Sequence, residues 1–244
     1  MPKTIHLLAS GTWGDVQPYL ALGLGLQAAG FRPVVATHAA FRPAVERWGL
    51  EYAPLADNPS DLMTAPGGQS ALTYDGSWLR SARLTLDYMR RARPLYTRLL
   101  ESAWYACQGA DALVAGLAAC WAPHIAEALG VPCIWAFLQP FSRTRCFPSA
   151  LLPTRFSLGK AYNWLTYPLV EQAMWQPWRG VTDRLRRTLL GLGRAPLLGP
   201  LPAVYHSGEA LLYGYSAHVA PPPPDWPAHH HLTGYWFLPP AMGR

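Results

Sequence analysis

Asp15 is the residue of this 244-residue chain whose position points most directly to catalysis. It is the one carboxylate between Met1 and Arg42, and it follows the turn Ser10–Gly14, which holds two glycines. A carboxylate at this point could take a proton from a substrate hydroxyl, and backbone N–H groups at a helix start could bind a phosphate. Asp15 could equally be a helix N-cap, so the turn alone leaves both interpretations open.

Other common chemical motifs are not found in the sequence. Gly11 and Gly14 have two residues between them, which differs from the G-x-G-x-x-G spacing, and the chain has no G-x-x-x-x-G-K-[ST] pattern. Metal binding is not expected, because the adjacent histidines His229–His231 would point to alternating faces of a strand. The cysteines form no close pair, so we expect reduced, mostly buried thiols at Cys107, Cys120, Cys133 and Cys146.

Strands and helices are predicted to alternate around Asp15. An apolar run at residues 5–9 predicts a buried strand, and Pro18 suits the first turn of a helix that Gly30 ends. The later predicted elements are strands at 33–37, 51–55, 111–116, 132–137, 210–215 and 231–237, and helices at 40–48, 78–107, 121–129 and 160–190.

This order predicts an α/β domain, a Rossmann-like parallel sheet with right-handed crossovers and helices on both faces. Residues 57–77 are rich in polar and turn-forming residues and predict a loop. Pro94 is expected to kink or divide the long helix in which it lies. Asp15 then follows the carboxyl end of the first strand, where open α/β sheets place their chemistry.

Several segments of the chain resemble the sterol 3β-glucosyltransferases and related antibiotic glycosyltransferases. Ser10–Gly23 resembles the opening of that family, whose pattern is G-[ST]-R-G-D-V-Q-P, with Trp13 in place of the usual arginine. Gln139–Pro148 resembles the sterol-enzyme segment M-P-W-T-R-T-R-x-Y-P, and Thr233–Leu238 resembles the T-G-Y-W-F-L that precedes the interdomain linker. Shorter resemblances lie at Ala36–Arg42, Gly49–Tyr52, Asp57–Pro59 and Tyr162–Tyr167. Together these segments cover nearly all of the chain.

The resemblance implies the N-terminal half of a GT-B fold, of the glycosyltransferase family 1 and 28 type, in which two Rossmann-like domains face a cleft. In that family the N-terminal domain holds the acceptor, the C-terminal domain binds a nucleotide-sugar, and transfer inverts the anomeric centre without a metal. Residues 1–237 are then expected to be the acceptor-binding domain and residues 238–244 the start of the linker, with the donor domain absent. The implied function is hexosyl transfer from a nucleotide-sugar, expected to be UDP-glucose, to a sterol-like or lipid acceptor, with no cofactor.

The resemblance also implies roles for individual residues. Asp15 falls on the carboxylate that activates the acceptor hydroxyl, and Trp13 removes a cation that usually lies near the donor phosphates. The turn residues expected to lie beside those phosphates are Ser10, Gly11, Thr12 and Gly14. The residues expected to bind the acceptor are His38, His124, Gln139, Phe141, Arg143 and Trp175.

Each of these acceptor candidates has a structural alternative. A histidine can be an ordinary core residue, and an arginine can be solvated or can bind an anion instead of lining the acceptor pocket. Aromatic residues such as Phe141 and Trp175 are typical of lipid pockets, but they are equally typical of a packed core.

The charge of the chain bears on its partners and location. The net charge of +6 favours anionic partners such as phosphates or a membrane surface, and no nucleic-acid partner is predicted. The Arg-rich stretch 78–98 could lie on an anionic membrane or form a solvated helix face. No apolar run reaches 18 residues and no signal-peptide pattern is present, so the predicted location is cytoplasmic or peripheral at the membrane. The alternative function is a non-catalytic module from a truncated gene that binds an apolar alcohol or a membrane.

Overall fold

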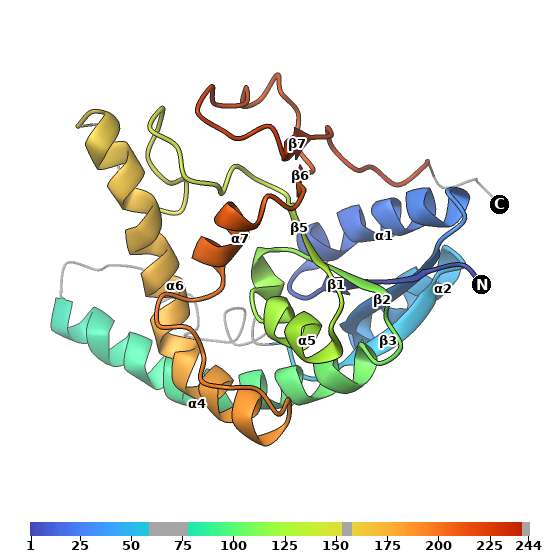
Figure 1. Cartoon of the computed structure of the whole chain (residues 1–244). Coiled ribbons are helices and arrows are strands. Elements are labelled where there is room, and N and C mark those ends of the chain that lie inside the picture. Colours follow the sequence, from blue (N-terminus) through green and yellow to red (C-terminus); the bar gives the residue numbers. More distant parts are fainter. Residues whose placement is uncertain (59–77, 153–157, 241–244) are drawn as a thin grey trace.

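A parallel sheet lies at the centre of the computed structural model, which describes residues 1–58, 78–152 and 158–240 (Figure 1). Within those residues seven strands run in the order β3-β2-β1-β4-β5-β6-β7, and every neighbouring pair is parallel. The strands are β1 (Thr4–Ala9), β2 (Arg32–His38), β3 (Glu51–Leu55), β4 (Ala112–Ala115), β5 (Cys133–Phe137), β6 (Leu211–Tyr213) and β7 (His230–Leu232). The strand order reverses between β1 and β4, which is the place where open α/β sheets bind ligands.

Helices cover both faces of this sheet. They are α1 (Trp13–Ala28), α2 (Arg42–Arg47), α4 (Trp78–Ala106), α5 (Ala122–Leu129), α6 (Lys160–Thr188) and α7 (Leu201–Ser207). On one face α1 and α2 share a core cluster with Leu7 and Val35, and on the other α4 and α5 share a cluster with Leu8 and Ala36. Successive strand residues therefore point to opposite faces, and the predicted Rossmann-like sheet with helices on both faces is confirmed.

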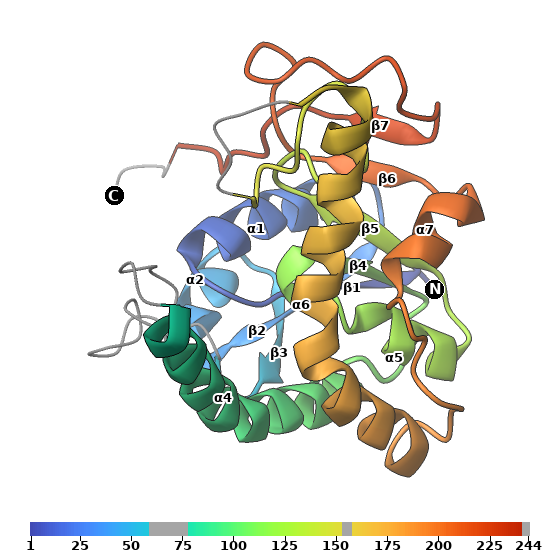
Figure 2. The same ribbon diagram turned by 90° about the vertical axis from the view of Figure 1, so that its left-hand side faces the viewer.

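The longest helices, α4 and α6, pack against each other beside the sheet. Figure 2 shows α6 standing in front of the sheet, with α4 below it and α7 to one side. The rings of Tyr96 in α4 and Trp178 in α6 stack with 4.7 Å between their centroids. In the described part of the chain, no helix combines the length and the apolar character that crossing a membrane requires.

The helix starts differ from the predicted ones. α1 begins at Trp13, so Pro18 lies inside the helix rather than in its first turn. Because proline has no N–H for the carbonyl of Gly14, the helix continues there with one hydrogen bond fewer. α4 also continues through Pro94 as one helix. The sequence analysis did not predict α7, because the prolines at its start are typical of a loop.

The last predicted strand, at 231–237, is wrong beyond Leu232. The N–H and the hydroxyl of Thr233, which follows the last paired residue Leu232, both donate to the carbonyl of Tyr213 at 3.0 Å. Gly234 then adopts a φ of +78°, which redirects the chain away from the sheet. The ring of Trp236 packs directly on Gly214, where an added Cβ would lie 3.1 Å from it.

The cysteines are free thiols whose burial varies. Cys107 is buried and Cys146 is exposed, so the expectation of mostly buried thiols is wrong at Cys146. Burial raises the pKa of the Cys107 and Cys133 thiols to about 12, which keeps both protonated at neutral pH.

Two predicted segments fall partly outside the described residues. They are residues 59–77 of the predicted loop and residues 241–244 of the predicted linker.

Candidate active site

A cavity of about 450 Å³ opens where β1, β4 and β5 end. Its wall combines the first turn of the chain, the segments that follow β4 and β5, and one side chain of α6. The lining residues are Leu8, Ala9, Ser10, Asp15, Tyr19, Gly116, Leu117, Ala118, Ala119, Phe137, Leu138, Gln139 and Met174. Most of these side chains are apolar, and a few polar groups lie among them, as in many sites for small organic ligands.

Asp15 is held in a fixed orientation at this cavity. Its Oδ2 accepts hydrogen bonds from the backbone N–H of Thr12 at 2.8 Å and from the Thr12 hydroxyl at 3.0 Å. Thr12 is the N-cap of α1 and Asp15 is the third helical residue, so the carboxylate completes a capping box. Among the described residues Oδ1 has no hydrogen-bond partner. Asp15 therefore caps the helix and still offers one oxygen to the cavity.

Gly11 makes room for this carboxylate. Its φ of +122° is one that side-chain-bearing residues rarely adopt, and an added Cβ would lie 2.4 Å from Oδ2 of Asp15. The turn therefore needs glycine at this position for two separate reasons.

The turn is also held from neighbouring strands. The Ser10 hydroxyl lies 3.0 Å from Nε2 of His38, and both side chains are buried. His38 thus lies behind the cavity wall, with Ser10 between it and the cavity. The side-chain amide of Asn58 donates to the carbonyl of Gly11 at 2.6 Å. Asn58 was not predicted, although it lies in the segment 57–59 that resembles the family.

Tyr19 is a wall residue that the sequence analysis also missed. Its hydroxyl donates to the carbonyl of Ala136 at 2.6 Å, and burial raises the pKa of the phenol well above its usual range. An added Cβ on Gly116 would lie 2.4 Å from this hydroxyl, so the glycine that follows β4 is needed for the contact. Trp236 packs edge-on against the Tyr19 ring, with 6.2 Å between the centroids.

The predicted acceptor residues have different positions. Gln139 lines the cavity. Phe141 is buried behind the lining residue Phe137, with 5.1 Å between their ring centroids. The indole N–H of Trp175 donates to the carbonyls of residues 196 and 197 at 3.2 Å. The predicted acceptor residues that are not part of the lining are His38, His124, Phe141, Arg143 and Trp175.

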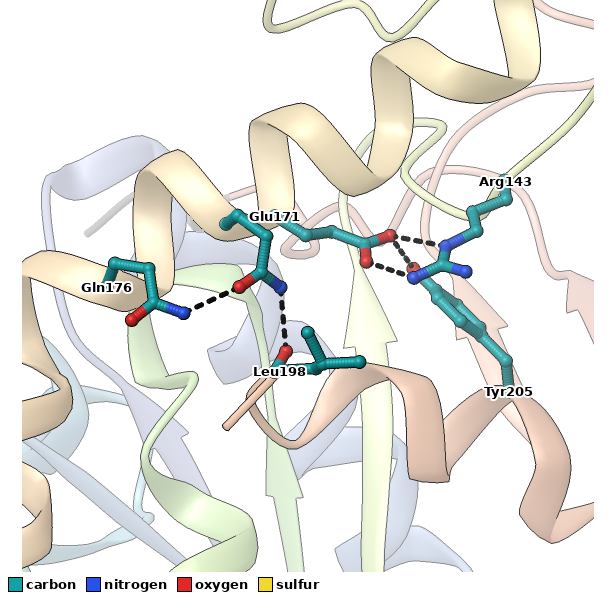
Figure 3. Close-up of polar contacts among 6 residues, drawn as sticks. Arg143, Glu171, Gln176, Leu198 and Tyr205 are labelled. Atoms are coloured by element: carbon teal, nitrogen blue, oxygen red, sulfur yellow. Dashed lines mark hydrogen bonds and ion pairs between the residues drawn. The ribbon is translucent and has the colours of Figure 1, made fainter. Parts of the chain in front are cut away.

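Arg143 forms an ion pair instead of lining the cavity. Figure 3 shows Arg143 and Glu171 of α6 facing each other, with Tyr205 of α7 beside them. Nε and Nη2 of the guanidinium donate to the two carboxylate oxygens at 2.9 and 2.5 Å. The guanidinium carbon lies 5.6 Å from the ring centroid of Trp164 and 5.4 Å from that of Tyr205. Arg143 therefore connects the segment after β5 to α6 and α7.

His124 lies on α5 and is buried against α6. Nη1 of Arg186 donates to its Nδ1 at 2.9 Å, and Arg186 also pairs with Glu127 at 2.6 Å. Burial, together with the nearby Arg186 guanidinium, lowers the pKa of His124 to about 4. His124 is therefore neutral at physiological pH, and its Nδ1 accepts a hydrogen bond from Arg186.

The lowered pKa of His124 predicts that the free energy of unfolding falls at acidic pH. Because the pKa of His124 is about 4 in the folded chain and 6.5 in the unfolded one, the unfolded state binds the proton first. The contribution of neutral His124 to the free energy of unfolding is fully present above pH 6.5. Roughly 3 kcal/mol of it is lost as the pH falls to 4. Thermal unfolding followed from pH 7.5 to about 4.5 measures this slope.

A matched pair of variants isolates the contribution of His124. His124→Asn keeps an acceptor for Arg186 and should reduce the slope, while His6 and His230, whose pKa values burial also lowers, still contribute to it. The same change at the exposed His218 should leave the slope as in the parent chain. An unchanged slope in His124→Asn would show that other groups cause the acid sensitivity.

Comparison with known proteins identifies the family. A family model described as the glycosyltransferase family 28 N-terminal domain matches residues 5–148, which is more than half of the chain. The chain belongs to this glycosyltransferase family. The family 28 match includes the turn, Asp15 and every lining segment of the cavity except Met174 of α6.

Curated relatives of this family 28 domain are longer proteins. The sterol 3-beta-glucosyltransferase of Aspergillus fumigatus is 40% identical over 234 residues, covering 96% of this chain and 16% of the relative. The enzyme of the same name from Emericella nidulans is 40% identical over 237 residues, covering 97% and 16%. The chain therefore spans about 16% of the length of these relatives.

Solved structures confirm the fold of the family 28 domain. The calicheamicin glycosyltransferase CalG4 has a TM-score of 0.55 and 17% identity, covering 96% of this chain and 52% of that chain. The glycosyltransferase of kitacinnamycin has a TM-score of 0.50 and 20% identity, covering 100% and 52%. The predicted N-terminal half of a GT-B fold is thus confirmed as the architecture of this chain.

Proposed function

We propose that this chain is the acceptor-binding part of a hexosyltransferase that acts on a sterol-like alcohol. The observation that carries the proposal is the free oxygen of the Asp15 carboxylate at an apolar cavity of about 450 Å³. Small-molecule sites in proteins commonly have this size and this mixture of apolar walls with few polar groups. The 40% identity to sterol 3-beta-glucosyltransferases supports a sterol-like acceptor.

The proposed reaction uses Asp15 as a general base. Its carboxylate takes the proton of the acceptor hydroxyl, and the hydroxyl oxygen attacks the anomeric carbon of the donor sugar. The bond from that carbon to the diphosphate breaks on the opposite side, and the nucleoside diphosphate leaves with the electron pair. Attack from the opposite side inverts the anomeric centre. The two hydrogen bonds from Thr12 keep the carboxylate aimed at the cavity.

The proposed donor is a nucleotide-sugar such as UDP-glucose, bound by a second domain that faces this edge of the sheet, and the reaction needs no metal. The N-terminus of α1 supplies N–H groups that favour the donor phosphates. The N–H of Thr12 and the hydroxyl of Ser10 already bond Asp15 and His38, so Gly14 is the better candidate for this contact. Trp13 points to a separate groove beside Phe41, with 6.1 Å between the two ring centroids.

A variant that fills the cavity tests acceptor binding. Ala118 is exposed and lines the cavity, so Ala118→Trp should block the site without disturbing the core. We expect titration with dehydroergosterol, a fluorescent sterol, to show binding at least ~10-fold weaker in Ala118→Trp, the loss of about 1.4 kcal/mol of contact. Ala118→Ser is the matched control and should bind as the parent chain does. Equal sterol binding by the parent chain and Ala118→Trp would contradict the proposal.

A further inference from the structure

One face of α6 carries leucines that are unusually exposed. Leu165 and Leu169 are 59% and 62% exposed, and Leu197 and Leu198, in the loop before α7, are 62% and 56% exposed. Buried leucines stabilise a fold, whereas adjacent exposed ones mark contact surfaces. We call the surface formed by these four leucines together with Arg179, Arg187 and Arg194 the α6 edge.

Hydrogen bonds join the loop leucines to the same face of α6. Gln172 donates to the carbonyl of Leu198 and Gln176 to that of Leu197, both at 2.9 Å. Figure 3 shows Gln176 donating to the side-chain oxygen of Gln172, whose amide in turn donates to the carbonyl of Leu198. Leu165, Leu169 and the two glutamines follow the three- and four-residue spacing of one helix face. The exposed leucine side chains are therefore held by an ordered backbone on a single surface.

Cationic side chains continue this face toward the end of α6. Arg179, Arg187 and Arg194 surround a hollow of about 280 Å³ together with Asp183. The Asp183 carboxylate accepts from the N–H of Ala195 at 2.9 Å and pairs with Arg187 at 3.0 Å. The hollow therefore keeps an excess of positive charge. Residues 158–200 hold six Lys and Arg against two Asp and Glu.

We propose that the α6 edge docks on the surface of an anionic lipid bilayer. The four leucines enter the boundary between headgroups and acyl chains, and the arginines bind lipid phosphates, as in other peripheral helices. The leucines and the arginines occupy separate zones of the α6 edge. This separation matches the apolar and phosphate layers of a bilayer surface better than the surface of a partner protein, where apolar and charged groups are interspersed. The charge of the edge makes the anionic bilayer the better match.

The sequence analysis assigned membrane contact to the Arg-rich stretch 78–98 instead. Among the described side chains of α4, from Asp87 on, Arg90, Arg91 and Arg93 are exposed, but the large exposed apolar side chain is Tyr105 at the far end. Within residues 87–98, the part of that stretch whose side chains the structure describes, no large apolar side chain is exposed to anchor the helix at a bilayer.

The position of α6 connects this surface to the cavity. Met174 lines the cavity, and it lies two residues from Gln172, on the opposite side of the helix. One face of α6 would thus contact the lipid while the other contacts a lipid-derived acceptor. Docking itself is independent of the proposed function, because it involves no turnover.

Vesicle flotation of the full chain tests the proposal. We expect binding to vesicles of equal parts phosphatidylcholine and phosphatidylglycerol, weakened by salt and weak on phosphatidylcholine alone. Leu197→Ser with Leu198→Ser should weaken vesicle binding at least ~10-fold, because each change removes a leucine side chain that would be buried in the lipid. Arg179→Gln with Arg194→Gln should weaken it roughly fivefold per charge removed.

Matched controls lie on the other side of the molecule, where the segment 233–240 passes α1 (Figure 1). Phe237 is 73% exposed, so Phe237→Ser removes comparable apolar surface and should leave vesicle binding unchanged. Absence of binding to the anionic vesicles would overturn the proposal. Full binding by the leucine variant, or loss of binding only on Arg90→Gln with Arg91→Gln, would also overturn it. Sterol binding in solution would persist in any of these cases, so the two proposals fail separately.

Discussion

Asp15→Asn is expected to reduce hexose transfer by about 10²–10⁴-fold, the range that a positioned general base contributes. The asparagine carbonyl can still accept the hydrogen bonds from Thr12, so the capping box and the fold should be kept. The acceptor KM should change little, because the cavity wall is the same. The measurement is steady-state transfer from UDP-glucose to a sterol, with the chain joined to a donor-binding domain.

A variant of Thr12, whose hydrogen bonds hold the Asp15 carboxylate, distinguishes the role of the base from that of the residue that orients it. Thr12→Val removes the hydroxyl donor but keeps the carboxylate and the backbone N–H bond, so transfer should fall far less than in Asp15→Asn. Full turnover by Asp15→Asn would refute the assignment of Asp15 as the base. Sterol binding without any turnover, in the parent chain as well, would favour the non-catalytic module.

Arg143→Met is expected to destabilise the fold by about 3–5 kcal/mol, because it leaves a buried carboxylate without its partner. The side chain of Glu171 is 2% exposed, and both of its oxygens accept from the guanidinium. A loss of this size is a large part of the ~5–15 kcal/mol by which a domain is normally stable. Urea unfolding of the parent and variant chains measures it.

The exposed pair Arg32–Glu51 is the matched control for this ion pair. Its geometry is equally bidentate, at 2.6 and 2.7 Å, but both side chains are about half exposed. Surface pairs contribute little, so Arg32→Met should leave the unfolding midpoint almost unchanged. Adding Glu171→Gln to Arg143→Met should restore part of the lost stability. Equal losses of unfolding free energy in Arg143→Met and Arg32→Met would contradict the claim that burial makes the unpaired Glu171 carboxylate costly.

The general fold could be predicted from local patterns in the sequence. Apolar runs bounded by glycine and proline located the strands, and the turn between β1 and α1 located Asp15 at the edge of the sheet. The last strand was predicted too long, because its apolar pattern continues to Phe237 although Gly234, with a φ of +78°, turns the chain after Leu232. The apolar residues beyond Gly234 pack on other elements, as Trp236 does on Gly214, and the local pattern does not show such tertiary contacts.

The cavity was predicted only in part, for a similar reason. Ser10 and Gln139 come just after strands, and Asp15 lies in the first turn of the helix that follows β1, so their place at the carboxyl edge could be inferred. Tyr19 and Met174 reach the cavity from helices, and their direction depends on how those helices pack. Phe141 follows β5, while His124 lies on α5 and Trp175 on α6, but the side chains of all three bond or pack within the core.

The most direct test of this account is the position of a bound sterol in a crystal structure of the chain. If Asp15 is the base, the hydroxyl oxygen of the sterol should lie within about 2.6–3.2 Å of the Asp15 carboxylate. Its ring system should then extend past Ala118 and Met174, through the cavity. A sterol bound in the cavity with its hydroxyl pointing away from Asp15, or bound elsewhere on the chain, would contradict the account.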